Sequence, residues 1–186
     1  MTPLRSRCAV ATVFFVNGVV IASWVPHVPG VKVRHGLGDG ELGLVLLALA
    51  AGAVLALPAA GDRLAGAFGP GLVLRASGAV AALGLGGALS IGAPAAAIAG
   101  CGAVGLGIAN IIPLLFSAAT RAPGVQAGTA LAAVATTGYL GFLAGPPLIG
   151  LAAEIVGLPA ALGIVSGCCG LVALGAGVIG PTEAPA

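Results

Sequence analysis

Charged residues divide the chain into long uncharged runs. These runs cover residues 8–31, 42–61, 76–120, 122–153 and 155–182. One transmembrane helix needs about 20 consecutive apolar residues. The run from 76 to 120 has room for two helices, and Gly92-Ala93-Pro94 supplies a break between them. The pattern therefore predicts six membrane spans, near residues 8–29, 42–60, 72–91, 95–116, 129–150 and 158–179.

Composition agrees with a chain surrounded by lipid. Hydrophobic residues make up 59% of the sequence and charged residues 6%, whereas soluble domains average about 25% charged residues. The apolar runs are continuous and do not alternate with polar positions, which excludes transmembrane β-strands. The 33 glycines suit helices whose backbones approach closely in a bilayer. We therefore predict an all-α, polytopic transmembrane helix bundle with no room for a soluble domain.

The basic residues predict how the bundle is oriented. Arg5, Arg7, Arg63, Arg75 and Arg121 fall on one side of the predicted membrane, and only Lys32 and Arg34 fall on the other. The positive-inside rule then places both termini in the cytoplasm. The first apolar run is too long for a signal peptide and has no A-x-A site, so we expect it to remain as a span. The net charge of +2 gives no reason to expect a nucleic-acid partner.

One stretch matches a nucleotide-binding motif by spacing alone. Residues 100–105 read GCGAVG, the G-x-G-x-x-G fingerprint of dinucleotide sites. That fingerprint needs a preceding strand and an acid about 20 residues later, but the next acid is Glu154. We interpret these glycines as helix-packing positions, together with the G-x-x-x-G pairs Gly141/Gly145 and Gly163/Gly167. The four cysteines lack metal-ligand spacing, so we expect no metal. No span shows the acids, histidines or serine-based dyad that an intramembrane enzyme needs at depth, so we also expect no enzymatic activity and no cofactor.

Uncharged polar residues inside the spans are the candidates for a solute site. Asn17 shares a helical face with Phe14, Ile21 and Trp24, which gives a wall with one amide and an aromatic ring. The cavity candidates are Asn17, Trp24, Asn110, Thr136 and Tyr139. A buried amide needs a partner in lipid, and that partner is either a ligand or another helix. Both interpretations stay open for Asn17 and Asn110.

Two long stretches resemble the major facilitator superfamily (MFS) of secondary transporters. The opening, FFVNGVVIASWVPHVPGVKVRHGLGDGELGLVLLALAAG, is similar to the first two helices of a bacterial inner-membrane, sugar-permease-like branch. Asp39 to Gly43 resembles the start of helix two in that branch. GLGIANIIPLLFSAA and AAVATTGYLGFLAGPPLIG resemble its helices ten and eleven. Intact members have twelve helices in two six-helix halves, whereas this chain has room for six. The resemblance therefore implies the start of the first half followed by the end of the second half.

The loop between the second and third spans resembles a family motif in part. The family's motif at this loop resembles G-x-L-A-D-R-x-G-R-R. Leu64, Phe68 and Gly69 of this chain fit that pattern. Its acid and base positions hold Gly66 and Ala67. Gly61, Asp62 and Arg63 instead fit the weaker copy between helices eight and nine. The resemblance therefore implies an internal truncation that joins helix two to helix eight near residues 55–62.

These expectations define the organisation and function to be tested. Residues 1–60 are first-half-like helices, 61–75 the cytoplasmic junction loop, 76–180 four second-half-like helices and 181–186 a cytoplasmic tail. The resemblance implies transport of a small solute by alternating access in the bacterial inner membrane. One half cannot alternate alone, so a homodimer or a second transporter half is expected as partner, beside the lipid bilayer. The alternative is a truncated, non-transporting membrane fragment or a helix-packing partner of another protein.

Overall fold

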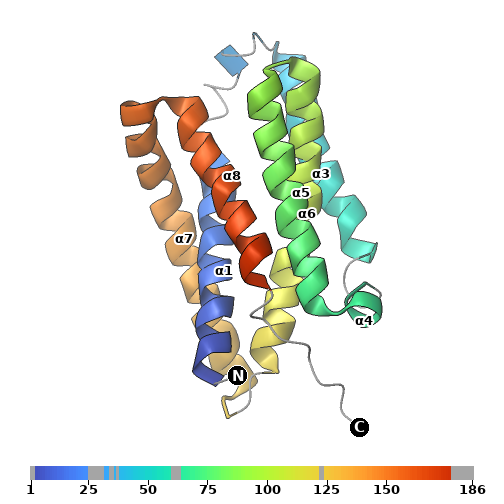
Figure 1. Ribbon diagram of the computed structural model, residues 1–186, viewed down its shortest axis with the longest axis vertical. Helices are drawn as coiled ribbons and strands as arrows, with labels where there is room; N and C mark the ends of the chain where they lie inside the picture. The colour runs from blue at the N-terminus through green and yellow to red at the C-terminus, as the bar shows by residue number, and fades with distance from the viewer. Residues whose placement is uncertain are drawn as a thin grey trace.

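Helices account for nearly all of the structure in a computed structural model of the chain (Figure 1). The structure describes residues 3–24, 32–33, 36, 38–59, 64–121 and 124–176. The helices are α1 (Pro3–Trp24), α3 (Asp39–Ala59), α4 (Ala65–Phe68), α5 (Pro70–Ile91), α6 (Pro94–Thr120), α7 (Ala127–Val156) and α8 (Leu158–Gly175). The prediction of an all-α transmembrane bundle is confirmed. Four of these helices, α5 to α8, are by length and composition able to cross a membrane.

Glycine and proline separate the successive helices. Gly69, Gly92 and Gly157 all have positive φ angles, of 80°, 69° and 81°. Glycine adopts this conformation without a steric penalty, whereas an L side chain does not. A proline follows within two residues in each case and lies in the first turn of the next helix, where its missing N–H leaves no hydrogen bond unmade. The predicted break at Gly92-Ala93-Pro94 is therefore confirmed.

The start of α3 has an acidic cap. The Glu41 carboxylate accepts a hydrogen bond from the backbone N–H of Gly38 at 2.9 Å, which is one half of a capping box. Lys32 forms an ion pair with Asp39 in the first turn of the helix. The hydrogen bond from Lys32, together with its positive charge, lowers the pKa of Asp39. The Asp-x-Glu stretch therefore begins the second long helix, at Asp39 rather than at the predicted residue 42.

Other helix boundaries also differ from the predicted spans. The fifth long helix continues to Val156, although the sequence pattern ended it near 150. Glu154 did not end the helix because its side chain is exposed and needs no apolar surroundings. The conformation of Gly157 ends it instead. Similarly, α5 begins at Pro70, inside the stretch 61–75 that was expected to be loop, and α4 occupies part of the same stretch.

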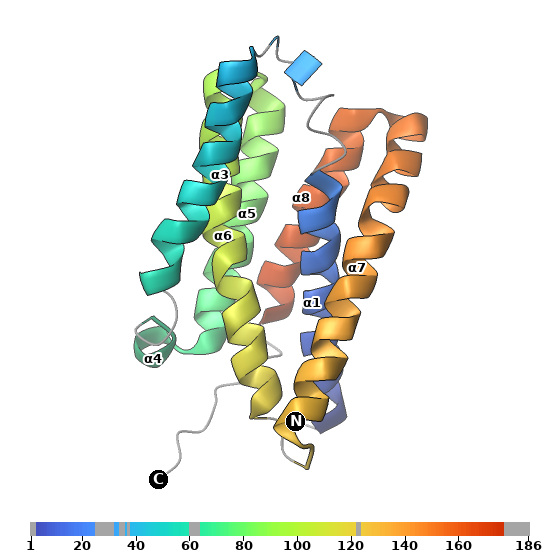
Figure 2. The same cartoon turned by 180° about the vertical axis from the view of Figure 1, so that it is seen from behind.

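The long helices form two groups of three that lie side by side (Figures 1 and 2). One group holds α1, α7 and α8, and the other holds α3, α5 and α6. The most extensive contacts are those of α1 with α7, α5 with α6 and α3 with α6, and α5 packs on α8 to join the groups. In both views α1 and α7 rise from the same end, while α3 and α6 descend together. Each group therefore contains one parallel pair.

The largest buried cluster lies at the end where α1 begins. Val10 and Phe14 of α1 meet Leu74 of α5, Leu115 of α6 and Val172 of α8 there. The start of α1 and the end of α8 are thus on the same side of the bundle. Long apolar side chains such as Leu83, Leu143 and Ile155 are more than 70% exposed on the outer surface. An apolar outside is the surface that a bilayer solvates.

Candidate functional site

A cavity of about 300 Å³ lies between the two groups of helices. Its walls come from α1, α3, α5, α6 and α8, so residues far apart in the sequence meet around it. The lining residues are Val20, Ile21, Leu49, Ala53, Leu85, Cys101, Val104, Gly105, Ile108, Ala109, Ile112, Leu162 and Val165. The volume is at the lower end of the range for small-molecule sites. The lining is almost entirely hydrocarbon.

Asn17 lies one helical turn before the cavity-lining residues of α1. Successive residues of a helix are rotated by about 100°, so the direction of Asn17 falls between those of Val20 and Ile21. Its side chain is 3% exposed. Its Oδ1 atom is buried without a hydrogen-bond partner among the described residues. Asn17 therefore faces the cavity side of α1 with an unused acceptor.

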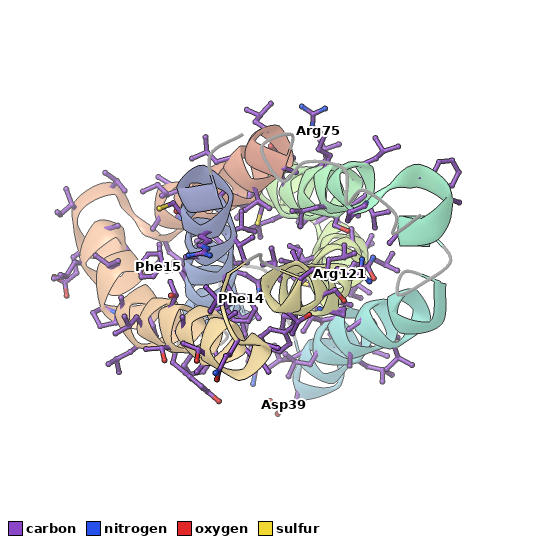
Figure 3. All side chains as sticks on the ribbon, turned by 90° about the horizontal axis from the view of Figure 1, so that it is seen from below. Phe14, Phe15, Asp39, Arg75 and Arg121 are labelled. Carbon is purple, nitrogen blue, oxygen red and sulfur yellow. The ribbon has the colours of Figure 1, made fainter. Side chains whose placement is uncertain are left out.

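An aromatic pair lies beyond Asn17, further from the cavity. The rings of Phe14 and Phe116 stack with centroids 5.2 Å apart and an interplanar angle of 25°. The Phe14 ring also lies against Gly138 of α7, where a Cβ atom would overlap it. In Figure 3, which looks from below, Phe14 is labelled where α1 faces α6 and α7. The pair connects the two helix groups below the cavity.

Asn110 lies on a different side of α6 from the cavity. The lining residues of α6 recur at positions 101, 104, 105, 108, 109 and 112. Asn110 is about half a turn away from the centre of that face. Its Nδ2 donates to the carbonyl oxygen of Leu106 at 3.4 Å, and Leu106 is 40% exposed. The structure therefore does not bring Asn110 and Asn17 together in this cavity.

The remaining cavity candidates lie on α7 and at the end of α1. The Thr136 hydroxyl donates to the Ala132 carbonyl within its own helix at 2.8 Å. Tyr139 is 76% exposed on the outer face of the bundle. Trp24 is the last residue of α1, and its side chain lies outside the described residues. A role for these three residues in solute binding stays a prediction.

Glycines bring the parallel helix pairs into backbone contact. A Cβ atom on Gly18 would overlap the carbonyl oxygen of Gly138, and one on Gly141 would overlap that of Phe15. In the other group, Gly52 and Gly105 stand in the same way against the carbonyl oxygens of Gly102 and Leu49. Such approaches need residues without a side chain. Sequence reasoning missed Gly18 and Gly52, because a lone glycine has no spacing signal.

The glycines of GCGAVG all lie inside α6 and face other helices. A Cβ atom on Gly100 would lie 2.5 Å from the carbonyl oxygen of Gly84 in α5, while Gly102 and Gly105 face α3. The helix-packing interpretation is confirmed for this stretch. It is also confirmed for Gly141 and Gly145, which pack on α1. It is wrong for Gly163 and Gly167, which are exposed on α8 with open space beside them.

The loop motif is described only in its second half. Gly61, Asp62 and Arg63 lie outside the described residues. Leu64 packs beside the largest buried cluster, and Phe68 is 62% exposed. Gly69 has a φ of 80° and caps the short helix α4. The Arg75 side chain, one turn into α5, points away from the bundle, and Arg121 ends α6 (Figure 3).

The described part of the chain offers no group of three or more His, Cys, Asp or Glu side chains that would hold a metal ion. Its cysteines, Cys8, Cys101, Cys168 and Cys169, are all free thiols. The cavity lining itself is hydrocarbon apart from the Cys101 thiol, and the Asn17 amide lies one helical turn from it on α1.

Comparison with known proteins finds two that are similar to the chain in sequence. No family model matches the chain. Over 123 residues, 66% of its length, the chain is 40% identical to the membrane protein MosC of Rhizobium meliloti. Over 106 residues, 57% of its length, it is 40% identical to an uncharacterized MFS-type transporter of Yersinia pestis. The resemblance to the major facilitator superfamily is confirmed.

The matches cover only part of the relatives. The aligned residues make up 30% of MosC and 28% of the MFS-type transporter. The alignments thus match the chain to less than a third of the length of each relative. The two alignments support a multi-pass membrane protein with transporter-like sequence.

Proposed function

We propose that the chain is a six-span, half-transporter-like unit of the MFS type that takes part in moving a small solute across the membrane. The observation that carries the proposal is the cavity between two groups of helices, in a chain that is 40% identical to an MFS-type transporter over 106 residues. Solute sites of secondary transporters lie near the membrane midplane, between repeats that move against one another. We assign the chain no catalytic step of its own.

The six-span arrangement adds α1 and α3 to the four apolar helices α5 to α8. The helices α1 and α3 have 22 and 21 residues, which is enough for one crossing each. Their parallel partners α7 and α6 are both long apolar helices. Arg7 lies close to Gly124, since a Cβ atom on Gly124 would be 4.0 Å from an Arg7 guanidinium nitrogen. This proximity supports an arrangement in which the start of α1 and the loop before α7 lie at the same end of the bundle, which we propose is the cytoplasmic end.

Alternating access requires a second body against which this bundle moves. We propose that a second copy of the chain or a second transporter half supplies it, in the bacterial inner membrane. An internal join of first-half-like to second-half-like helices near residues 55–62 explains how one chain carries both kinds of sequence. The crossing of α1 with α7 and that of α3 with α6 use the same glycine–carbonyl contacts. This similarity supports an internal join that preserves the helix packing of one transporter half.

The second candidate is a membrane fragment that does not transport. Support for it is that the aligned residues make up only 30% and 28% of the relatives, so most of their length has no counterpart in the alignments. Proteoliposome uptake of labelled sugars, polyols and small aromatic alcohols, measured beside the oligomeric state, separates the two. Saturable uptake by a dimer supports transport. A strict monomer without solute-dependent flux contradicts it and leaves the fragment.

A further inference from the structure

The walls of the cavity select against polar and charged ligands. Every lining residue is aliphatic, except for Gly105 and the Cys101 thiol. A charged or multiply hydroxylated solute would lose its hydration there and gain no hydrogen bonds in return. An apolar body loses nothing by entering and fills space that is otherwise without contacts. The cavity is therefore shaped for hydrocarbon or an aromatic ring.

Asn17 adds one polar feature next to these walls. Its Oδ1 is a buried acceptor without a partner among the described residues, on the side of α1 that carries Val20 and Ile21. Buried acceptors are normally paired, and an exception calls for an explanation. The terminal torsion of Asn has a broad energy profile, which allows the amide to direct Oδ1 toward a donor in the cavity. An O–H or N–H donor from a ligand would satisfy it.

We propose that the cavity binds a neutral ligand with an apolar body and a single O–H or N–H donor, and that Asn17 Oδ1 accepts the hydrogen bond from that donor. The Phe14–Phe116 stack lies beyond the amide, outside the cavity lining. Identifying this ligand with the transported solute rests on the proposed function. Binding itself does not, because equilibrium binding is measured without flux.

Naphthalene and 2-naphthol are suitable probes because they have nearly the same shape and differ by one hydroxyl. Their fluorescence is titrated with the full chain in lipid nanodiscs, and protein-free nanodiscs give the partition into lipid. We expect 2-naphthol to bind about fivefold more tightly than naphthalene after this correction, the size of one net hydrogen bond. In Asn17→Leu the two probes should bind equally. Asn110→Leu removes an amide from the other side of α6 and should keep the fivefold preference.

Two further measurements keep the test decisive. Ala109→Leu fills the cavity, so both probes should bind at least about tenfold more weakly. Asn17→Leu is judged to fold by its helix content and monodispersity. If it does not fold, the unmodified protein is titrated with 2-methoxynaphthalene instead. This probe has the oxygen but no donor, and should bind like naphthalene. The proposal is overturned if the protein adds no binding beyond lipid, or if 2-methoxynaphthalene matches 2-naphthol. An undiminished preference in folded Asn17→Leu also overturns it. Binding without uptake would preserve the site and contradict transport only.

Discussion

Gly18 of α1 and Gly141 of α7 are reciprocal contacts. Gly18 lies against the carbonyl oxygen of Gly138, three residues before Gly141. Gly141 lies against the carbonyl oxygen of Phe15, three residues before Gly18. Gly52 and Gly105 repeat this arrangement between α3 and α6, against Gly102 and Leu49. In both crossings the helix backbones touch, and Cα–H groups are positioned to face carbonyl oxygens. The same contact thus joins one parallel pair in each helix group, and α1, α3 and α6 of these pairs also line the cavity.

Replacing Gly141 by alanine should separate α1 from α7. The added methyl group meets backbone atoms of Phe15, which cannot move aside as a side chain does. We expect a loss of about 1–3 kcal/mol in the free energy of unfolding. Unfolding in mixed micelles with increasing sodium dodecyl sulfate measures it. Gly163→Ala is the matched control, because Gly163 has open space beside it and should change stability by less than about 1 kcal/mol. Equal losses in both variants would contradict the contact.

The GCGAVG stretch offers a comparison within six residues. Gly105→Ala should destabilise the protein about as much as Gly141→Ala, because the two glycines hold equivalent crossings. Gly102→Ala should be nearly neutral, since a Cβ atom there meets Ala48 at an ordinary 3.6 Å. The same unfolding assay applies. If Gly102→Ala proves the more damaging change, the equivalence of the two crossings is wrong.

The aromatic pair below Asn17 should couple the two helix groups. Phe14→Ala and Phe116→Ala each remove a ring and leave a void, at a cost of about 3–5 kcal/mol. A double-mutant cycle should give a coupling of about 0.5–1.5 kcal/mol for the stack. Phe142→Ala, whose side chain is 51% exposed on α7, should cost much less. Strictly additive losses for Phe14 and Phe116 would show that the rings do not interact.

The ion pair at the start of α3 predicts a pH dependence of known sign. Lys32 lowers the pKa of Asp39 through a hydrogen bond and its charge. The pair therefore stabilises the fold above the ordinary aspartate pKa, and this contribution is lost as pH falls through the lowered pKa. Because Asp39 is exposed, the effect on stability should be small. In Lys32→Ala the pKa of Asp39, followed by carboxyl carbon-13 NMR, should rise; an unchanged pKa would contradict the pairing.

The sequence was sufficient to predict the six long helices of the described chain but not the short helix α4, because hydropathy and Gly-Pro breaks mark long apolar segments. It placed the break at Gly92-Ala93-Pro94 correctly but ended the fifth span too early, since an exposed Glu154 does not stop a helix. It was less informative about which helices meet. The motifs at Gly141/Gly145 and Gly163/Gly167 look alike, yet only the first pair faces a neighbouring helix.

The candidate site shows the same division. The face shared by Asn17 and Ile21 could be read from helical spacing within one span, and the structure places that face toward the cavity. The cavity walls from α3, α5 and α8 could not be predicted, because they depend on how distant helices pack. For the same reason the sequence did not reveal that Asn110 lies on another side of α6 from the lining residues.

Labelling of single cysteines tests the six-span account most directly. In a cysteine-free background, Glu41→Cys, Phe68→Cys, Gln126→Cys and Glu154→Cys each place one thiol at an exposed position at a helix end. A membrane-impermeant maleimide is applied to spheroplasts before and after permeabilisation. The account predicts reaction from outside at 41 and 154, and reaction at 68 and 126 only after permeabilisation. Reaction at 41 and 68 from the same side would show that α3 does not cross the membrane and would contradict the account.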